Sequence, residues 1–244
     1  MKTLLPFIFI LGFLPGQDWP TAEQVLAQVD ANMVAGNRMT IATMVIHGRR
    51  DSRTLQIQSW IQGEDRSFSE YLSPPGERGI KMLKLKDELW TYSPQSDRTI
   101  RIAGHMLRQS LNGSDLSYED MLEDNELLHS YTAVLLDSGR VADRPCWILE
   151  LTAKRSDVTY HSRRIWVDRE RFIALQEERF AKSGKLLKTT RIEEMFFQDE
   201  RWYPRRITFQ DMLKKGGGTE LILDSLNFDI VIPDHLFTRA ALRQ

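Results

Sequence analysis

The chain has 244 residues, of which 41% are hydrophobic and 27% are charged, as in an ordinary globular protein. Its 33 basic and 34 acidic residues nearly cancel, which argues against a general polyanion-binding protein, so we expect no nucleic-acid partner. The single cysteine, Cys146, excludes an intramolecular disulfide. We expect it to be a buried structural thiol rather than a nucleophile.

The N-terminus has the pattern of a secretory signal. Met1 and Lys2 precede an apolar run that ends at Leu14, and Pro15-Gly16 separates this run from polar sequence. The run is short for a membrane span. We therefore predict a signal peptide over residues 1–16 and a mature domain over residues 17–244, with an uncleaved anchor as the alternative.

An amphipathic helix is predicted at the start of the mature domain, between Pro20 or Thr21 and Gly36. Its apolar residues follow helical spacing, and they are Val25, Leu26, Val29, Met33 and Val34. A helix with one apolar stripe packs that stripe onto a sheet.

From about Thr40, apolar residues alternate with polar ones, which indicates strands. In one such run, Leu55, Ile57 and Ile61 share a face. Similar runs recur to the end of the chain and are separated by turn sequences, which predicts about a dozen antiparallel strands. A single sheet of this size must curl, and the helices are available to cover its concave face.

Residues 105–122 interrupt the strand pattern. His105–Leu111 have helical spacing, with Met106, Leu107 and Leu111 apolar. A helical insert within a series of antiparallel strands lies most economically across the face of the sheet, so we expect a lid or plug. The tail predicts another short helix after Pro233.

Acidic residues gather in the second half of this insert. Ser114 or Asp115 is placed to cap a helix, and Glu119 and Asp120 fall in its first turns. The three carboxylates are also a conceivable site for a hard cation. Helix capping and solvation explain them more simply, so we predict no metal site.

The usual arrangements of catalytic residues are missing from the sequence. The five histidines lack metal-ligand spacing, and no GxSxG motif occurs. Glu177 and Glu178 are adjacent in a predicted strand, so they point to opposite faces. Lys214-Lys215-Gly216-Gly217-Gly218 has the wrong order for a phosphate-binding loop and predicts a hairpin connection. We predict neither catalytic residues nor a cofactor, and a hydrolase is the disfavoured enzymatic alternative.

Four segments together resemble a known family: GSDLSYEDM, IWVDRERFIALQEERFAKSGKLLKTTRIEE, WYPRRITFQD and IPDHLFTRAAL. Their order and spacing are similar to those of the LolA-like outer-membrane lipoprotein-sorting proteins, over most of the mature chain. The resemblance implies a strongly curved, incompletely closed antiparallel barrel with helices on its concave face. It also implies a periplasmic carrier of lipoprotein acyl chains or a related lipid, monomeric, with a membrane-protein donor or acceptor.

An acyl chain costs about 0.8 kcal/mol per exposed methylene, so carriage through water needs a shielded apolar cavity. The predicted cavity residues are Ile57, Ile61, Met82, Leu149 and Leu151, and the predicted lid contacts are Met106, Leu107 and Leu111. A deep apolar cavity under the insert would support carriage, whereas a filled core beside a polar cleft would oppose it. The alternatives are a lipid-sensing envelope-stress module similar to the RseB regulators and an accessory protein of a lipid-exporting transporter.

Overall fold

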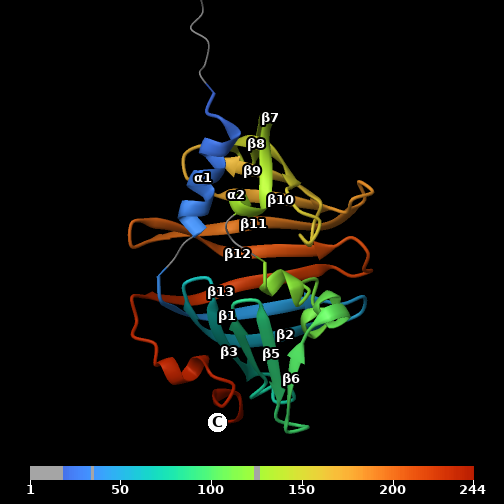
Figure 1. Ribbon diagram of the computed structural model, residues 1–244, viewed down its shortest axis with the longest axis vertical. Helices are drawn as coiled ribbons and strands as arrows, with labels where there is room; N and C mark the ends of the chain where they lie inside the picture. The colour runs from blue at the N-terminus through green and yellow to red at the C-terminus, as the bar shows by residue number, and fades with distance from the viewer. Residues whose placement is uncertain (1–18, 34–35, 124–126) are drawn as a thin grey trace, which may run out of the picture.

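The computed structural model describes residues 19–33, 36–123 and 127–244. The predicted signal peptide, the side chain of Met33 and Val34 lie outside this description. The described residues form one antiparallel sheet of 13 strands with few helices (Figure 1), so the prediction of a mainly β fold built on a single sheet is confirmed. No helix among the described residues is both long and apolar enough to cross a membrane.

The strands are β1 (Arg38–His47), β2 (Ser52–Gln62), β3 (Arg66–Ser73), β4 (Lys81–Leu85), β5 (Glu88–Ser93), β6 (Arg98–Ile102), β7 (Tyr131–Val141), β8 (Arg144–Ala153), β9 (Ser162–Asp168), β10 (Ala174–Phe180), β11 (Leu186–Gln198), β12 (Arg201–Asp211) and β13 (Gly218–Phe228). The α-helices are α1 (Ala22–Met33) and α2 (Leu127–Ser130). The 3₁₀ turns are η1 (Gly104–Arg108), η2 (Leu111–Gly113), η3 (Glu119–Met121), η4 (Asp234–Phe237) and η5 (Ala241–Arg243).

The order of strands across the sheet follows the chain with one exception. From the centre, β1 continues through β2 to β6 on one side, and β13 continues back through β12 to β7 on the other. The exception is the pairing of β1 with β13, which joins the two ends of the sequence. The consecutive strands β6 and β7 are therefore the two edges of the sheet, and residues 103–130 connect one edge to the other.

Tight turns explain why neighbours in sequence are neighbours in the sheet. Ala142-Asp143 connects β7 to β8, with φ values of 45° and 63°, and Asp199-Glu200 connects β11 to β12, with φ values of 48° and 60°. Two consecutive left-handed residues match the right-handed twist of paired strands. Each such turn forces the next strand to pair antiparallel with the last.

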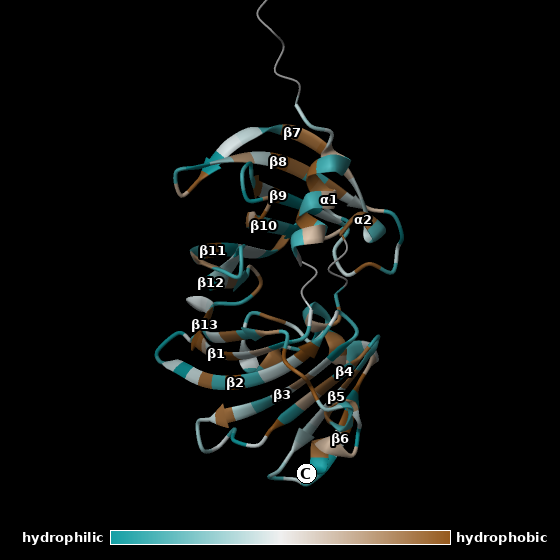
Figure 2. Ribbon diagram, turned by 90° about the vertical axis from the view of Figure 1, so that its left-hand side faces the viewer, coloured by the Kyte–Doolittle hydropathy of each residue, from teal (hydrophilic) through white to brown (hydrophobic). Residues whose placement is uncertain are grey.

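Helix α1 forms where it is predicted and covers one end of the sheet. Thr21 and Gln24 cap it reciprocally, because each backbone N–H donates to the other side chain at 2.9 and 3.2 Å. Its buried residues Val25, Leu26 and Val29 pack on β7, β8 and β9 and form what we call the upper core. In Figure 2, α1 and α2 lie on the same side of these strands.

The other half of the sheet, β1 to β6, is covered on both faces. One face forms the lower core with Leu55, Met82 and Leu111. The opposite face packs against the C-terminal segment, where Phe237 and Leu242 contact Phe68 and Leu83 among others. Met82 and Leu83 are consecutive in β4 and point to opposite faces, as strand geometry requires.

Helical structure forms within residues 105–122 and after Pro233, where it is predicted, but it is not α-helical. Both segments form short 3₁₀ turns instead. In the first segment Asn112 adopts a left-handed conformation (φ 49°, ψ 34°), and Ser110 pairs with Ser117 in an isolated bridge. Serine and aspartate side chains there bond to nearby backbone groups, which competes with helix formation.

Candidate functional site: the crossing segment and its charged cluster

Residues 103–123, here called the crossing segment, run over the sheet from the β6 side towards β7. Their side chains and carbonyl groups contact the strands in the order in which the strands lie. The contacts are Asn112 with Arg53 of β2, Asp115 with Thr219 of β13 and Asp211 of β12, Asp120 with Lys188 of β11 and Arg179 of β10, and Glu123 with Arg163 of β9. The segment thus lies across the face of the open sheet, as predicted for this insert, and leads from the β6 edge towards the β7 edge.

The first half of the crossing segment is apolar on the side that faces the sheet. Met106, Leu107 and Leu111 pack against the lower core, which also contains Ile57 and Met82. Five of the eight residues predicted to contact a ligand are therefore brought together. Leu111 is 3% exposed and Met82 is 6% exposed, so the crossing segment fills this core.

The remaining predicted residues lie elsewhere. Leu149 and Leu151 are fully buried in the upper core, beneath α1. Ile61 lies on the same face of β2 as Ile57 but is part of neither core. The alternation of apolar and polar residues correctly predicts which face of its strand each residue occupies. It carries no information on the distance between strands, and β8 and β2 belong to different halves of the sheet.

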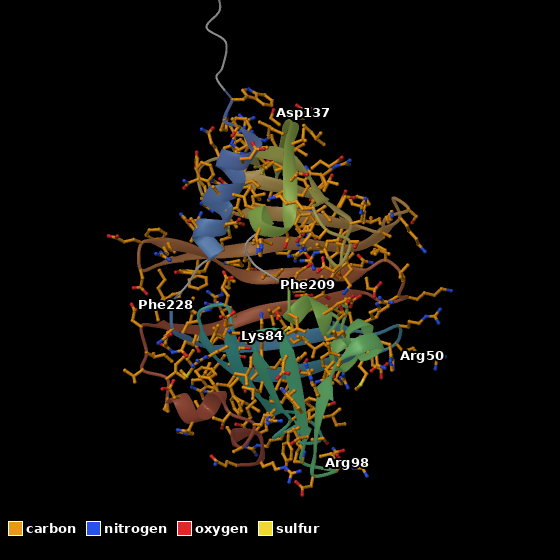
Figure 3. The ribbon with its side chains drawn as sticks, in the orientation of Figure 1. Arg50, Lys84, Arg98, Asp137, Phe209 and Phe228 are labelled. Atoms are coloured by element: carbon orange, nitrogen blue, oxygen red, sulfur yellow. The ribbon has the colours of Figure 1, made fainter. Side chains whose placement is uncertain are left out.

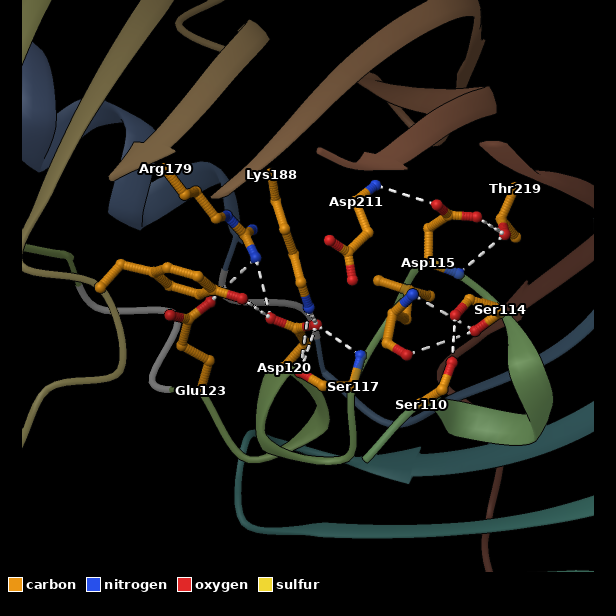
Figure 4. Close-up of polar contacts among 12 residues, drawn as sticks. Ser110, Ser114, Asp115, Ser117, Asp120, Glu123, Arg179, Lys188, Asp211 and Thr219 are labelled. Atoms are coloured by element: carbon orange, nitrogen blue, oxygen red, sulfur yellow. Dashed lines mark hydrogen bonds and ion pairs between the residues drawn. The ribbon is translucent and has the colours of Figure 1, made fainter. Parts of the chain in front are cut away.

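Beneath the second half of the crossing segment lies a group of buried ionic side chains, here called the charged cluster. Figure 4 shows Asp120, Glu123, Arg179 and Lys188 of this group. Its members are Asp120 and Glu123 from the segment, Tyr160 from the β8–β9 connection, and Arg163, Glu177, Arg179 and Lys188 from the sheet. Three carboxylates face three cations, so the cluster is neutral when all are ionised. None of the ionic side chains exceeds 15% exposure, although ions of this kind are rarely buried unless paired.

Asp120 is the hub of the cluster. It accepts hydrogen bonds from the Tyr160 hydroxyl at 2.6 Å and from Ser117, through the backbone N–H and the hydroxyl, each at 2.7 Å. It also pairs with Lys188 and, at 3.2 Å, with Arg179. One side chain of the crossing segment is therefore tied to three separate elements of the sheet and its connections.

The cations determine the charge of Asp120. Burial alone would raise the pKa of its carboxyl group, but Lys188 and Arg179 outweigh this effect, and the pKa lies below its usual value. For Glu123 the effect of burial is the larger one, so the pKa of its carboxyl group is raised even though Arg163 and Arg179 oppose the shift. Asp120 is thus held as the anion, and the ion pairs it makes persist throughout the neutral range.

Asp115 forms a second, smaller attachment. Its carboxylate accepts from the Thr219 hydroxyl at 2.7 Å and from the backbone N–H of Asp211 at 2.9 Å, and its own N–H donates to Thr219. Asp115 is 7% exposed. The prediction that Asp115 and Asp120 are helix caps and solvated charges is therefore wrong: both tie the crossing segment to the sheet.

A cleft of about 540 Å³ lies beside the cluster. It is lined mainly by polar and charged side chains from the β2–β3 and β4–β5 turns, the crossing segment, the β8–β9 connection and strand β9, among them Glu64, Lys86, Glu123, Arg155 and Arg163. No group of three or more metal-ligating side chains that could hold an ion occurs in the described part of the chain. The described residues thus form a filled core beside a polar cleft, the arrangement unfavourable to carriage unless the crossing segment moves.

Two buried features bear on the chemistry of the protein: a thiol in a separate core of the sheet, and two arginine side chains of the charged cluster. Cys146 is fully buried, as predicted, and burial raises the pKa of its thiol, which disfavours the reactive thiolate. The Nε atoms of Arg163 and Arg179 have no hydrogen-bond partner among the described residues. The cluster is therefore neutral in charge but incompletely hydrogen-bonded, which makes it a costly structure to bury.

The charged cluster is not among the sites predicted from the sequence, although the sequence contains a signal for it. Arg163 shares the face of β9 that carries Ile165 and Val167. A charged residue in phase with buried apolar ones indicates a buried ionic partner, and Glu177 and Arg179 occupy the same face of the next strand. The pairing partner on the crossing segment could not be found in this way, because it depends on contacts far apart in sequence.

Comparison with solved structures identifies the fold. A DUF1329 family protein from Desulfovibrio piger superposes with a TM-score of 0.84 at 22% identity, over 91% of this chain and 97% of that one. A putative outer membrane lipoprotein-sorting protein domain from Vibrio parahaemolyticus gives 0.78 at 20% identity, over 92% and 98%. The LolA superfamily protein NE2245 from Nitrosomonas europaea gives 0.75 at 25% identity, over 91% and 100%. The fold is that of the LolA-like proteins, and the predicted resemblance is confirmed.

A family model described as an uncharacterized protein matches residues 63–244. This range includes the whole crossing segment and every strand from β3 to β13, and the chain belongs to this family. No curated protein sequence matches the chain.

Proposed function

We propose that the chain is a periplasmic, non-enzymatic carrier of lipoprotein acyl chains or a related lipid, and that the structure represents its closed form. The observation that carries the proposal is the position of Met106, Leu107 and Leu111. They lie on the lower core between the two edges of an open sheet, where an acyl chain would be shielded.

In this proposal, cargo replaces the crossing segment on the lower core. An acyl chain gains about 0.8 kcal/mol for each methylene removed from water. It can occupy the surface formed by Ile57 and Met82 in place of Leu111, so one set of apolar contacts is exchanged for another. Methionine side chains suit such an exchange because they are flexible and polarizable.

The architecture allows this movement without breaking the sheet. The crossing segment consists of 3₁₀ turns rather than strands, and within the sheet β6 and β7 are each paired on one side only. Its second half is held by the charged cluster, whose burial is costly in the absence of complete hydrogen bonding. A polar attachment of this kind can be broken and reformed, because ions released from it are solvated by water.

The first test is chemical. The protein is purified from the periplasm, its lipids are extracted, and bound acyl species are identified by mass spectrometry. We expect a lipid or acyl chain at a stoichiometry near one. The second test is kinetic: uptake of a fluorescent fatty acid is measured for the wild type, for Asp120→Asn and for the exposed control Asp157→Asn.

We expect Asp120→Asn to take up the probe faster, because it loosens the crossing segment, and Asp157→Asn to behave as the wild type. Absence of any bound acyl species, together with no uptake by either the wild type or Asp120→Asn, would overturn the proposal. The full-length lipoprotein cargo and a membrane-protein donor or acceptor belong to the same proposal, and transfer between isolated membranes tests them.

A further inference from the structure

Three neighbouring turns project from one side of the central sheet. They connect β1 to β2 (residues 48–51), β12 to β13 (residues 212–217) and β10 to β11 (residues 181–185), and these strands are contiguous in the order β2-β1-β13-β12-β11-β10. The backbone N–H of Gly217 donates to the His47 carbonyl at 2.9 Å, and that of Met212 donates to the Leu187 carbonyl at 2.8 Å. The three turns therefore form one continuous surface, here called the basic turn surface.

Positive charge dominates this surface. Its exposed basic residues are Arg49, Arg50, Lys182, Lys185, Lys214 and Lys215, and Asp51 is the acidic residue within the three ranges. The whole chain has a formal net charge of -1, so the local excess is a property of this side and not of the composition. In Figure 3, Arg50 lies at the outer end of its hairpin, directed away from the sheet.

Two large apolar side chains stand at the apex of the middle turn. Met212 is 46% exposed and Leu213 is 59% exposed. The turn is held in shape, because the backbone N–H of Leu213 donates to the Asp211 carboxylate at 2.9 Å and that of Lys214 to the Asp211 carbonyl at 3.0 Å. The exposure of the two apolar residues is thus built into an ordered turn.

We propose that the basic turn surface docks on a phospholipid bilayer that contains anionic headgroups. Met212 and Leu213 enter the interfacial region, and the surrounding basic residues contact the headgroups. Apolar side chains flanked by lysine and arginine are the composition of peripheral membrane-binding surfaces. Each basic residue near an anionic membrane strengthens binding about fivefold.

The shape of the surface favours a membrane over a folded protein partner. The basic residues belong to three separate turn tips, and long flexible side chains of this kind suit mobile headgroups better than a fixed, complementary surface. Lys214 also donates to the Ser110 hydroxyl at 2.5 Å, which brings the crossing segment next to the docked turn. Docking itself does not depend on the proposed carriage, and the following test contains no cargo.

The test is cosedimentation of the exported full chain with vesicles of zwitterionic and anionic phospholipid in a 3:1 ratio, compared with purely zwitterionic vesicles. Two pairs of variants separate the contributions. Arg50→Glu/Lys215→Glu is compared with Arg98→Glu/Arg243→Glu, an equal charge change in exposed residues on distant elements. Leu213→Ser is compared with Val134→Ser, whose side chain is 60% exposed on β7. All variants share one N-terminus, so its contribution to binding cancels.

We expect the wild type to bind anionic vesicles, with binding that weakens as salt is raised. Arg50→Glu/Lys215→Glu lowers the partition coefficient at least about tenfold, given the contribution expected per basic residue, and Leu213→Ser lowers it about threefold or more; the two controls leave it unchanged. No wild-type binding, or equal effects of the turn variants and their controls, would overturn the proposal. Binding that appears only when the vesicles contain membrane proteins would assign the surface to a protein partner and would overturn it as well.

Discussion

Replacing Asp120 with alanine removes the carboxylate on which the charged cluster converges. The substitution leaves Lys188 without its close acceptor, takes one of three partners from Arg179, and removes the acceptor of the Tyr160 hydroxyl. The cluster changes from neutral to a net charge of +1 in a buried site. Removing one partner from a buried ion pair costs about 3–5 kcal/mol, because it leaves an uncompensated charge. Arg179 keeps Glu123 and Glu177, so Lys188 accounts for most of this cost.

The free energy of unfolding, measured by chemical denaturation at pH 7, tests this expectation. Asp157→Ala is the matched control, since Asp157 pairs with Arg155 at 3.2 Å while both side chains are more than half exposed. We expect the control to lose less than about 1 kcal/mol. Hydrogen exchange adds the local view: in Asp120→Ala, peptides from residues 103–123 should lose protection while peptides from β1 and β2 retain it.

A loss of stability for Asp120→Ala no larger than that of the control would refute the inference that the cluster holds the crossing segment. Equal loss of protection throughout the sheet would also count against it, because the segment would then not be a separately held element.

Three further expectations concern the same elements. In chemical denaturation, Leu111→Ala should lower the free energy of unfolding by about 2–4 kcal/mol, whereas Met121→Ala, at a residue that is 37% exposed, should lower it by less than about 1 kcal/mol. Equal losses would contradict the packing of Leu111 in the lower core. Gly218→Ala should lower the free energy of unfolding by about 1–3 kcal/mol, because φ is +90° and the added Cβ would lie 2.9 Å from the Phe209 carbonyl oxygen. An unchanged denaturation midpoint would exclude this strain. The lowered pKa of Asp120 contributes stability that is complete above the usual pKa of an aspartate and is lost as pH falls through the lowered value. The free energy of unfolding should therefore fall less steeply with acidification below about pH 4 in Asp120→Asn than in the wild type.

Local patterns in the sequence predict most of the fold. Alternation defines the faces of the strands, and short turns such as Asp199-Glu200 require antiparallel neighbours. The stripe of Val25, Leu26 and Val29 predicts α1 and its contact with the sheet. The pairing of β1 with β13 has no local cause, and it depends on packing between the two ends of the chain.

The site is predicted less completely, for three physical reasons. The alternation of side chains along a strand places Met82 and Leu149 on inward faces, but it does not show that they belong to separate cores. Helical spacing in residues 105–122 suggests α-helices, but short polar side chains bond to the backbone there and favour 3₁₀ turns. The role of Asp120 depends on Lys188, 68 residues away, and no local pattern reveals it.

In the proposed mechanism, an acyl chain replaces the crossing segment on the lower core. The most direct measurement is photo-crosslinking with a fatty acid that carries a diazirine on its chain, followed by mass spectrometric mapping of the labelled residues. Replacement of the crossing segment by an acyl chain predicts labelling of β2 and β4 at and around Ile57 and Met82, together with the facing residues Met106 and Leu111. Labelling confined to exposed surfaces, or no specific labelling at a concentration that saturates uptake, would contradict it.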